Sequence, residues 1–492
     1  MRNIVLSVAV ALFITFSFTL LHAQNIGEKI QVKWELIDNN YQGQRRSLTK
    51  FTIINRSNHP IPPQGWDLWF SNMRSIDVNS IQGDFTIKHI NGDLYKLSPS
   101  GSFDGLGISD SLEIRMEIKN RIPNFTDAPS GLYITSDLIE PSIQPITNVS
   151  ALPFSYSAEH DKKVLSELYD KNEKIKIKIN EPIPLSIIPS PKRLTLTNKH
   201  FILDRGVKII GADEFHREIK RIKGEIFSSN LGEQEGFTED SENTIRFEKL
   251  SSLGSEAYEL IINENEIIIK AATDAGAFYA IQSLLSLLPI SYFDGNQKSV
   301  KIPTLHIMDE PRLKYRGLMM DLARNFHDKN EVLQVLDLMA SYKLNVLHLH
   351  LNDDEGWRIE IPSIPELIEV GSNRSAKFEG GSTLQPSYGS GAYAKPKQFL
   401  SKEEFIEILK YADNLHIQVI PEIESPGHAR AAIKSMDYRA AQGMGSRISD
   451  PNDESVYSSA QYWTDNVMNV GLSSTFEFME TVIDDLISMY KE

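Results

Sequence analysis

Charged side chains and imidazoles gather at three points in the last third of the chain, and each point directly follows an apolar segment. The first point carries Asp321 and Arg324, the second is the run from His348 to Arg358, and the third is the run from Pro421 to His428. Carboxylates and imidazoles can pass protons to and from a bound substrate, and a guanidinium can hold its oxygen atoms. The alternative interpretation of each point is an ion pair that only stabilises the fold.

Two histidines of the second point raise the question of a metal. His348 and His350 are two positions apart, so on a strand their imidazoles lie on one face, and paired imidazoles suit zinc. Both precede Asp353, however, where the predicted strand reaches its end, and buried histidines usually hydrogen-bond to other protein groups. We therefore predict no metal and no other cofactor, and keep a metal-dependent hydrolase as an alternative.

A repeated strand–helix pattern must position these three groups of charged residues and histidines. The sequence predicts three pairs in turn, namely 315–322 with 329–342, 345–352 with 402–415, and 417–423 with 474–490. Such alternation is typical of a parallel sheet, and in a (β/α)₈ barrel the catalytic groups lie at the carboxyl ends of the strands. A closed barrel needs about 250 residues. Residues 311–492 hold only three units, so we expect an incomplete TIM barrel there.

Two further units precede this region. Residues 24–155 predict a β-sandwich, because apolar and polar side chains alternate from Leu112 to Ile118 and Asn91-Gly92 is a hairpin sequence.

Residues 156–183 are polar and rich in lysine, which predicts a linker or a connecting helix. Residues 184–310 predict a small α+β domain, with a hairpin over 258–269 followed by a helix that Asp274 can cap. Trp66 and Trp69 are interpreted as core residues, with a sugar platform as the alternative.

Bulk composition restricts the partners and the location. The net charge of −15 disfavours nucleic acid and anionic membranes, because phosphates would repel the chain.

Residues 1–23 begin with Arg2, continue with an apolar stretch to Leu21 and end at Ala23, which is the layout of a secretory signal peptide. A membrane anchor is the alternative. We expect a secreted or periplasmic protein without membrane contact after cleavage, and the absence of cysteine excludes disulfides and thiolate metal sites.

The three points together resemble glycoside hydrolase family 20. Residues 316–326 and 339–361 are similar to the start of that family's barrel, and residues 421–428 are similar to its third strand end. The upstream layout also resembles the family, with a sandwich of the chitobiase N-terminal type and an α+β domain that contains residues 275–284. The resemblance implies carbohydrate binding for the sandwich and a catalytic role for the barrel.

The resemblance implies a β-N-acetylhexosaminidase that removes terminal β-linked N-acetylglucosamine or N-acetylgalactosamine from glycans or chitooligosaccharides, with retention. In that family the acetamido oxygen of the substrate attacks the anomeric carbon, an Asp steadies the acetamide, and the adjacent Glu protonates the leaving oxygen. Carried over by residue, Arg324 would hold sugar hydroxyls. Asp353 and His428 would form a charged pair that supports the general acid.

The sequence departs from the family pattern at the acid itself. In the family the Asp–Glu pair follows His-x-Gly-Gly at the end of the fourth strand, and residues 1–492 contain no Gly-Gly-Asp-Glu. The Asp–Glu pairs at 309–310, 354–355 and 453–454 stand in other contexts. We therefore expect a fragment, truncated before its general acid and inactive by itself. The alternative is a truncated protein that only binds carbohydrate or has a structural role.

Overall fold

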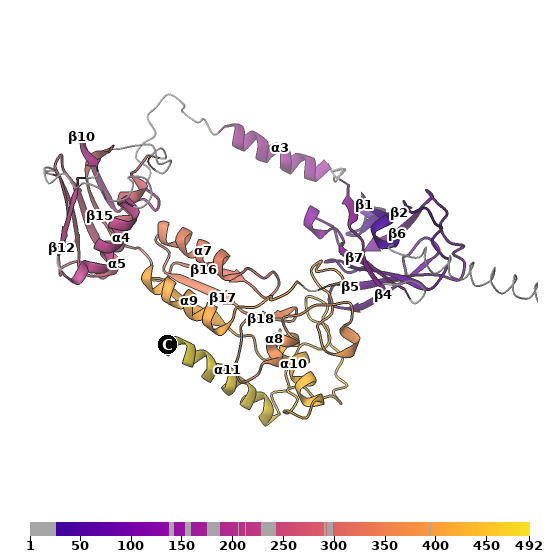
Figure 1. Ribbon diagram of the computed structural model, residues 1–492. Helices are drawn as coiled ribbons and strands as arrows, with labels where there is room; N and C mark the ends of the chain where they lie inside the picture. Colours follow the sequence, from indigo (N-terminus) through magenta and orange to yellow (C-terminus); the bar gives the residue numbers. More distant parts are fainter. Residues whose placement is uncertain are drawn as a thin grey trace, which may run out of the picture.

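The computed structural model describes residues 26–136, 142–152, 159–174, 187–204, 206–211, 213–227, 243–289, 292, 299–393 and 395–492. The predicted signal segment 1–23 lies outside these residues. Figure 1 shows three folded parts, with a β-sandwich and an α+β part on either side of a β/α part. Within the described ranges, no helix combines the length and the apolar character needed to cross a membrane.

The first part is the predicted β-sandwich, made of a four-stranded and a five-stranded sheet. The first sheet has the order β6 (Ser111–Ile118), β2 (Ser47–Asn55), β1 (Ile30–Asp38) and β9 (Asn148–Ala151). The second has the order β4 (Phe85–Asn91), β5 (Leu94–Pro99), β3 (Trp66–Ser71), β7 (Ser130–Ser136) and β8 (Ile143–Pro145). Short helical segments are α2 (Ile26–Lys29), η1 (Tyr41–Gly43) and η2 (Phe125–Asp127).

Apolar faces of the two sheets form the core of the sandwich. Phe51 of β2 meets Phe70 of β3 edge to face with ring centroids 5.2 Å apart. Trp66 and Trp69 are both buried, so the core interpretation is confirmed and the sugar platform is wrong. The predicted hairpin is present, because β4 and β5 pair antiparallel around Gly92, whose φ is 58°.

Helix α3 (Glu159–Glu173) lies within the segment predicted as a linker or connecting helix. Its described side chains are exposed, and it stands apart between the sandwich and the α+β part in Figure 1. Of the two predictions for residues 156–183, a linker or a connecting helix, the helix is confirmed over Glu159–Glu173.

The α+β part has one six-stranded sheet covered by helices. Its order is β10 (Arg193–Asp204), β15 (Ser299–Asp309), β13 (Tyr258–Ile262), β14 (Glu266–Ala271), β12 (Thr244–Lys249) and β11 (Lys208–Gly211). The helical elements are η3 (Asp213–Phe215), α4 (His216–Phe227) and α5 (Asp274–Ser286). The predicted cap at Asp274 is wrong by one residue, because the Thr273 hydroxyl accepts the hydrogen bond of the Gly276 N–H and Asp274 lies in the first turn.

The third part contains the three predicted parallel strands. The sheet order is β16 (Gly317–Asp321), β17 (Val346–His350) and β20 (Gln418–Glu422). Helices α7 (Lys329–Ser341) and α9 (Lys402–Asn414) pack beside it, and each begins with a capping box, at Asp328 and Ser401. The remaining elements are β18 (Asn352–Asp353), β19 (Gly356–Trp357), α8 (Glu366–Glu369), η4 (Phe378–Gly380), α10 (Arg430–Ala441) and α11 (Ser473–Lys491).

Helix α10 was not predicted, and it lies in the chain between β20 and the predicted helix α11. It has no side-chain cap at its amino end, so the usual helix start sequence is missing. Its buried side chains include Ala431, Ala432 and Ile433, and the helix packs against the loop that follows β17.

The two outer parts contact opposite ends of the parallel sheet. Lys343 and Arg316 precede β17 and β16, and they bond to Asp309 and Glu256 of the α+β part. Asn91 and Asp93 of the sandwich instead bond to loops at the other end of the sheet, where the strands finish. The sandwich is therefore the part that lies next to the strand ends where catalysis is expected.

Candidate active site

The register of the parallel sheet brings the three predicted points together. Asp321 pairs with His350, and His350 pairs with Glu422, so the ends of β16, β17 and β20 are level. The loops that leave these ends carry Arg324, Asp353 and His428. Because parallel strands finish at one edge, the three side chains lie close to each other, as the sequence predicts.

Asp353 is the centre of the resulting network. Its side chain is 1% exposed, and its Oδ1 lies 3.0 Å from His428 Nδ1. Its Oδ2 lies 2.9 Å from His350 Nε2 and 2.5 Å from Arg324 Nη2. The predicted contact between Asp353 and His428 is confirmed, whereas their support of a general acid stays a prediction.

Three cationic partners keep Asp353 ionised. Burial alone would raise its pKa, but the hydrogen bond from His350 and the charge of Arg324 lower it. For His428, burial alone would lower the pKa, and the charges of Asp353 and Asp354 raise it. His428 also has φ 51°, a sparsely populated conformation that turns its imidazole toward Asp353. A buried carboxylate and a protonatable imidazole are thus held in one fixed pair.

Arg324 lies at the end of the first strand, as predicted, and is almost fully engaged by carboxylates. Its Nη1 lies 2.9 Å from Asp321 Oδ2, and its Nε lies 3.1 Å from Glu355 Oε2. Together with Asp353, these carboxylates raise the pKa of Arg324 despite the opposing effect of burial. About a quarter of its side chain remains exposed, so Arg324 is less enclosed than Asp353 and Glu355.

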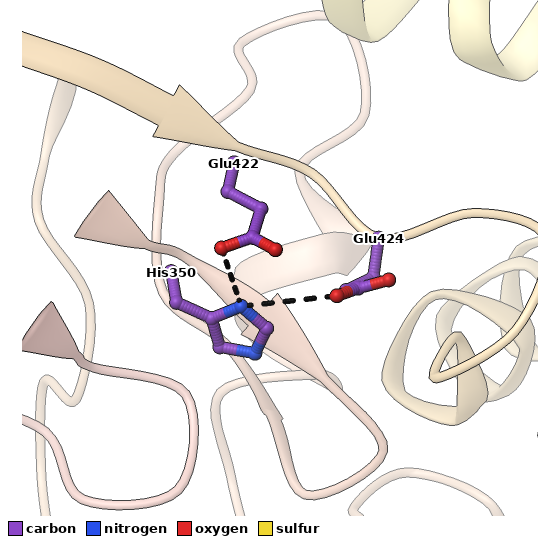
Figure 2. Close-up of side chains that lie close together, drawn as sticks. All are labelled: His350, Glu422 and Glu424. Atoms are coloured by element: carbon purple, nitrogen blue, oxygen red, sulfur yellow. Dashed lines mark ion pairs between the residues drawn. The ribbon is translucent and has the colours of Figure 1, made fainter. Parts of the chain in front are cut away.

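A second cluster joins His350 to the end of β20. In Figure 2 the imidazole of His350 faces the carboxylates of Glu422 and Glu424. Its Nδ1 lies 2.9 Å from Glu422 Oε2 and 3.9 Å from Glu424 Oε1. His348 Nε2 lies 2.8 Å from the same Glu422 oxygen, so the two histidines do share one face. Against the effect of burial, the hydrogen bonds to Asp353 and Glu422 raise the pKa of His350 to about 9.

Two groups of side chains at the strand ends have the geometry of either ion pairs or a cation site. His350, Glu422 and Glu424 have oxygen and nitrogen atoms close enough to hold a cation, as do Asp353, Asp354 and His428. With no cation bound, the raised pKa of His350 favours a protonated ring that donates to Asp353 and Glu422. A metal would need the neutral imidazole instead, so the metal-dependent hydrolase stays an alternative prediction.

Asp354 and Glu355 lie buried behind Asp353. Asp354 accepts hydrogen bonds from the Arg430 N–H at 3.2 Å and the Asn466 side chain at 2.9 Å, and burial raises its pKa to about 7. Burial and the charge of Asp353 also raise the pKa of Glu355, whose Oε1 accepts from Trp463 Nε1 at 3.0 Å. These two carboxylates shape the site from within the protein.

Sequence reasoning missed Trp463, which lies far along the chain in an irregular segment, and no pattern around it indicates a role. It also missed the buried guanidinium of Arg374, which donates to the backbone of Ala323 and Arg324. Trp357 is fully buried and donates to the Ile359 carbonyl at 2.6 Å, so it packs the loop and does not face a ligand.

Comparison with family models covers most of the chain. The model of the glycosyl hydrolase family 20 catalytic domain matches residues 313–492, and that of domain 2 of the same family matches residues 184–310. A model described as "Putative carbohydrate binding domain" matches residues 29–178. The parallel sheet with its polar strand ends thus falls in the catalytic-domain match.

Similar proteins include two bacterial enzymes. The N,N'-diacetylchitobiase of Vibrio harveyi is 32% identical over 474 residues, which cover 90% of this chain and 51% of that protein. The beta-hexosaminidase B of Pseudoalteromonas piscicida is 31% identical over 505 residues, with 94% of this chain and 63% of that protein covered. The chain therefore spans between half and two thirds of the length of these relatives.

A solved structure agrees with the sequence matches. The family 20 exo-β-N-acetylglucosaminidase from Vibrio harveyi superposes with a TM-score of 0.74 and 26% identity, over 94% of this chain and 66% of that one. The order of sandwich, α+β part and catalytic part is thus common to both. Since the two family 20 models together match residues 184–310 and 313–492, more than half of the chain, the chain belongs to glycosyl hydrolase family 20.

Proposed function

We propose that the protein carrying this chain is a β-N-acetylhexosaminidase that removes terminal β-linked N-acetylglucosamine or N-acetylgalactosamine from glycans or chitooligosaccharides. The observation that carries the proposal is the buried Asp353, joined at the strand ends to His428, His350 and Arg324. The names of the relatives, a chitobiase and a hexosaminidase, support the substrate class. We also propose secretion or export to the periplasm through residues 1–23.

The proposed reaction retains the anomeric configuration and uses the substrate's own acetamido oxygen as the nucleophile. In this scheme Arg324 holds sugar hydroxyls, because its guanidinium is fixed by three carboxylates and is still partly exposed. Asp353 and His428 form a charged pair that orients and tunes the general acid. Catalytic acids need a raised pKa, and a buried ionised carboxylate nearby raises it by repulsion.

The acid itself is proposed to be supplied by a His-x-Gly-Gly-Asp-Glu segment, which residues 1–492 do not contain. We further propose that β16, β17 and β20 are the first three strands of a (β/α)₈ barrel. Under this proposal the polypeptide of residues 24–492 does not hydrolyse hexosaminides when it is assayed alone. Loss of general acid catalysis lowers a rate by about 10²–10⁴-fold, and loss of an enclosed site lowers it further.

The test compares residues 24–492 with an extended polypeptide that also carries the His-x-Gly-Gly-Asp-Glu segment. Both are assayed on a chromogenic N-acetylglucosaminide, and only the extended one is expected to turn over. Turnover by residues 24–492 near the extended rate would show that the acid lies within them. An inactive but folded extended polypeptide would contradict the function. Activity that disappears after chelation would favour the metal-dependent hydrolase.

A further inference from the structure

The turn between β4 and β5 of the sandwich reaches the loops behind the candidate active site. At this turn the Asn91 side chain donates from Nδ2 to Asp465 Oδ1 at 2.8 Å and accepts at Oδ1 from the Thr464 N–H at 3.2 Å. The Asn91 carbonyl accepts from Gln385 Nε2 at 2.7 Å. One residue of the sandwich thus holds two loops of the catalytic part that are about 80 positions apart in the sequence.

Gly92 lies directly against the ring of Trp463. A Cβ atom on Gly92 would lie 2.6 Å from the indole, and the Gly92 N–H donates to the Tyr462 carbonyl at 3.2 Å. The indole also meets the guanidinium of Arg430, 4.6 Å from a ring centroid. The ring is 1% exposed. Trp463 therefore contacts both the sandwich and helix α10.

Trp463 connects the sandwich to the candidate active site through Glu355. Its Nε1 donates to Glu355 Oε1 at 3.0 Å, and the other oxygen of Glu355 accepts from Arg324 Nε at 3.1 Å. A tilt of the indole would move the carboxylate that fixes one edge of the guanidinium. Glu355 is 2% exposed, so no water can readily replace a lost hydrogen bond there.

A second contact of the same turn reaches a loop beside the site. Asp93 Oδ2 accepts from the Tyr388 N–H at 2.8 Å, and Tyr388 has φ 47°, a conformation that needs support from its surroundings. The neighbouring Gly389 packs on Gly131 of β7 so closely that a Cβ on Gly131 would lie 2.8 Å away. Burial first, and then the charge of Glu355, raise the pKa of Tyr388, which supports its position next to the carboxylate network.

We propose that the β4–β5 turn is a positioning element of the active site, in which Asn91 and Gly92 hold Trp463 and, through Glu355, set the orientation of Arg324. The proposal rests on the proposed function, because Arg324 matters to catalysis only if it holds the sugar. It gives the sandwich a role in the chemistry of the neighbouring part that is separate from carbohydrate binding. None of these sandwich residues touches the substrate, so they are positioning residues.

The first experiment uses the full chain and needs no activity. The chain has five tryptophans, and their indole N–H signals are recorded by ¹⁵N NMR, with the Trp463 signal assigned from its loss in Trp463→Phe. Asn91→Ala and Gly92→Ala should each shift or broaden the Trp463 signal and leave those of Trp34 and Trp357 in place. The control is Asn79→Ala, an exposed position of the same sandwich, which should move none of them.

The second experiment uses the extended polypeptide. Because the net loss of a hydrogen bond is worth roughly a factor of 2–12, Asn91→Ala should raise KM about 2- to 12-fold and change kcat less. A shifted Trp463 signal with an increased KM supports the proposal. An unchanged Trp463 signal in Asn91→Ala overturns it, as does a shifted signal with unchanged KM, which would leave a merely structural contact. If Gly92→Ala does not fold, Asn91→Ala decides alone.

The two experiments also separate this proposal from the proposed function. An extended polypeptide without hexosaminidase activity contradicts the function. The Trp463 signal in the full chain would still show whether the turn controls the indole.

Discussion

At the scale of single residues, the carboxylate of Asp353 contacts side chains from the ends of all three parallel strands. Asp353→Asn keeps the size of the side chain and removes the charge that raises the pKa of His428. We expect the pKa of His428 to fall toward the ordinary imidazole value, as measured by NMR titration of the ring signals in the full chain. The control Asp337→Asn, on the exposed face of α7, should leave that titration unchanged.

The raised pKa of His428 also affects the stability of the fold. A histidine with a raised pKa in the folded state stabilises the fold below its unfolded pKa near 6.5, and this contribution disappears as the pH rises through the raised value. The part of the pH dependence that comes from His428 should therefore become smaller in Asp353→Asn. An unaltered His428 titration in that variant would show that Asp353 does not control its charge.

The proposed role of Arg324 in holding the sugar requires the planar guanidinium with its several N–H donors, and a positive charge alone is not enough. In the extended polypeptide, Arg324→Lys should lower kcat/KM by about 10- to 100-fold, since a lysine has three N–H donors and no planar fork, and Asp321, Asp353 and Glu355 would leave it no donor for the sugar. Steady-state kinetics on the chromogenic substrate measure the change. The matched control Arg246→Lys alters an exposed pair on the α+β sheet and should leave kcat/KM unchanged. Near-normal kinetics for Arg324→Lys would contradict its role in holding the sugar.

At the scale of elements, the contact between the β4–β5 turn and the loop around Tyr388 buries Asp93. Burial raises its pKa to about 6, and its Oδ1 has no hydrogen-bond partner among the described residues. Because the folded pKa lies above the unfolded value of 3.8, Asp93 destabilises the fold increasingly as the pH rises from about 4 through 6. Above that range the folded protein holds a buried charge, which the hydrogen bonds from Tyr388 and Ser71 and the charge of Arg374 only partly offset.

Asp93→Asn is therefore expected to stabilise the protein above pH 6 by about 1–3 kcal/mol, because the amide oxygen can still accept the Tyr388 N–H without the charge. Urea unfolding at pH 4 and pH 7.5 measures the difference, which should be smaller at the lower pH. Asp84→Asn, at an exposed position of the same sandwich, is the control and should show no such gain. An equal effect of Asp93→Asn at both pH values would mean that its charge is not the cause.

At the scale of the whole molecule, the parallel sheet is held at both ends by other parts. Lys343 is buried at the amino end of β17, where its Nζ lies 2.8 Å from the Tyr258 hydroxyl, 2.7 Å from Ser283 Oγ and 3.2 Å from Asp309 Oδ2. Lys343→Met keeps the length of the side chain and leaves Asp309, whose side chain is mostly covered, without its cation. The expected loss is about 3–5 kcal/mol in the free energy of unfolding, measured with urea.

An exposed pair provides the matched comparison for Lys343. Lys249→Met breaks the ion pair with Glu214, in which both side chains are nearly half exposed, and should lower the free energy of unfolding by about 0–1 kcal/mol. Similar losses for the two variants would show that the contact at Lys343 does not hold the α+β part to the parallel sheet.

The sequence by itself determined the elements and the place of the site. Alternation along β6 and the strand–helix repeats after residue 311 predict local structure, because side-chain period and backbone conformation are coupled within a few residues. Since parallel strands finish at one edge, Arg324, Asp353 and His428 could also be predicted as neighbours. The same local rules failed at α10, which has no capping sequence, and at Asp274, where Thr273 offers an equivalent cap.

Only the tertiary structure decided which distant segments complete the site. Trp463 bonds to Glu355 across 108 positions, and Asn91 bonds to Asp465 across 374. The first contact depends on how a long irregular segment folds back within the catalytic part, and the second on how two whole parts dock, and neither leaves a periodic pattern near the residues involved. The partners of His350 were decided in the same way, because Asp353 and Glu422 come from different loops and reach different nitrogens of one buried ring.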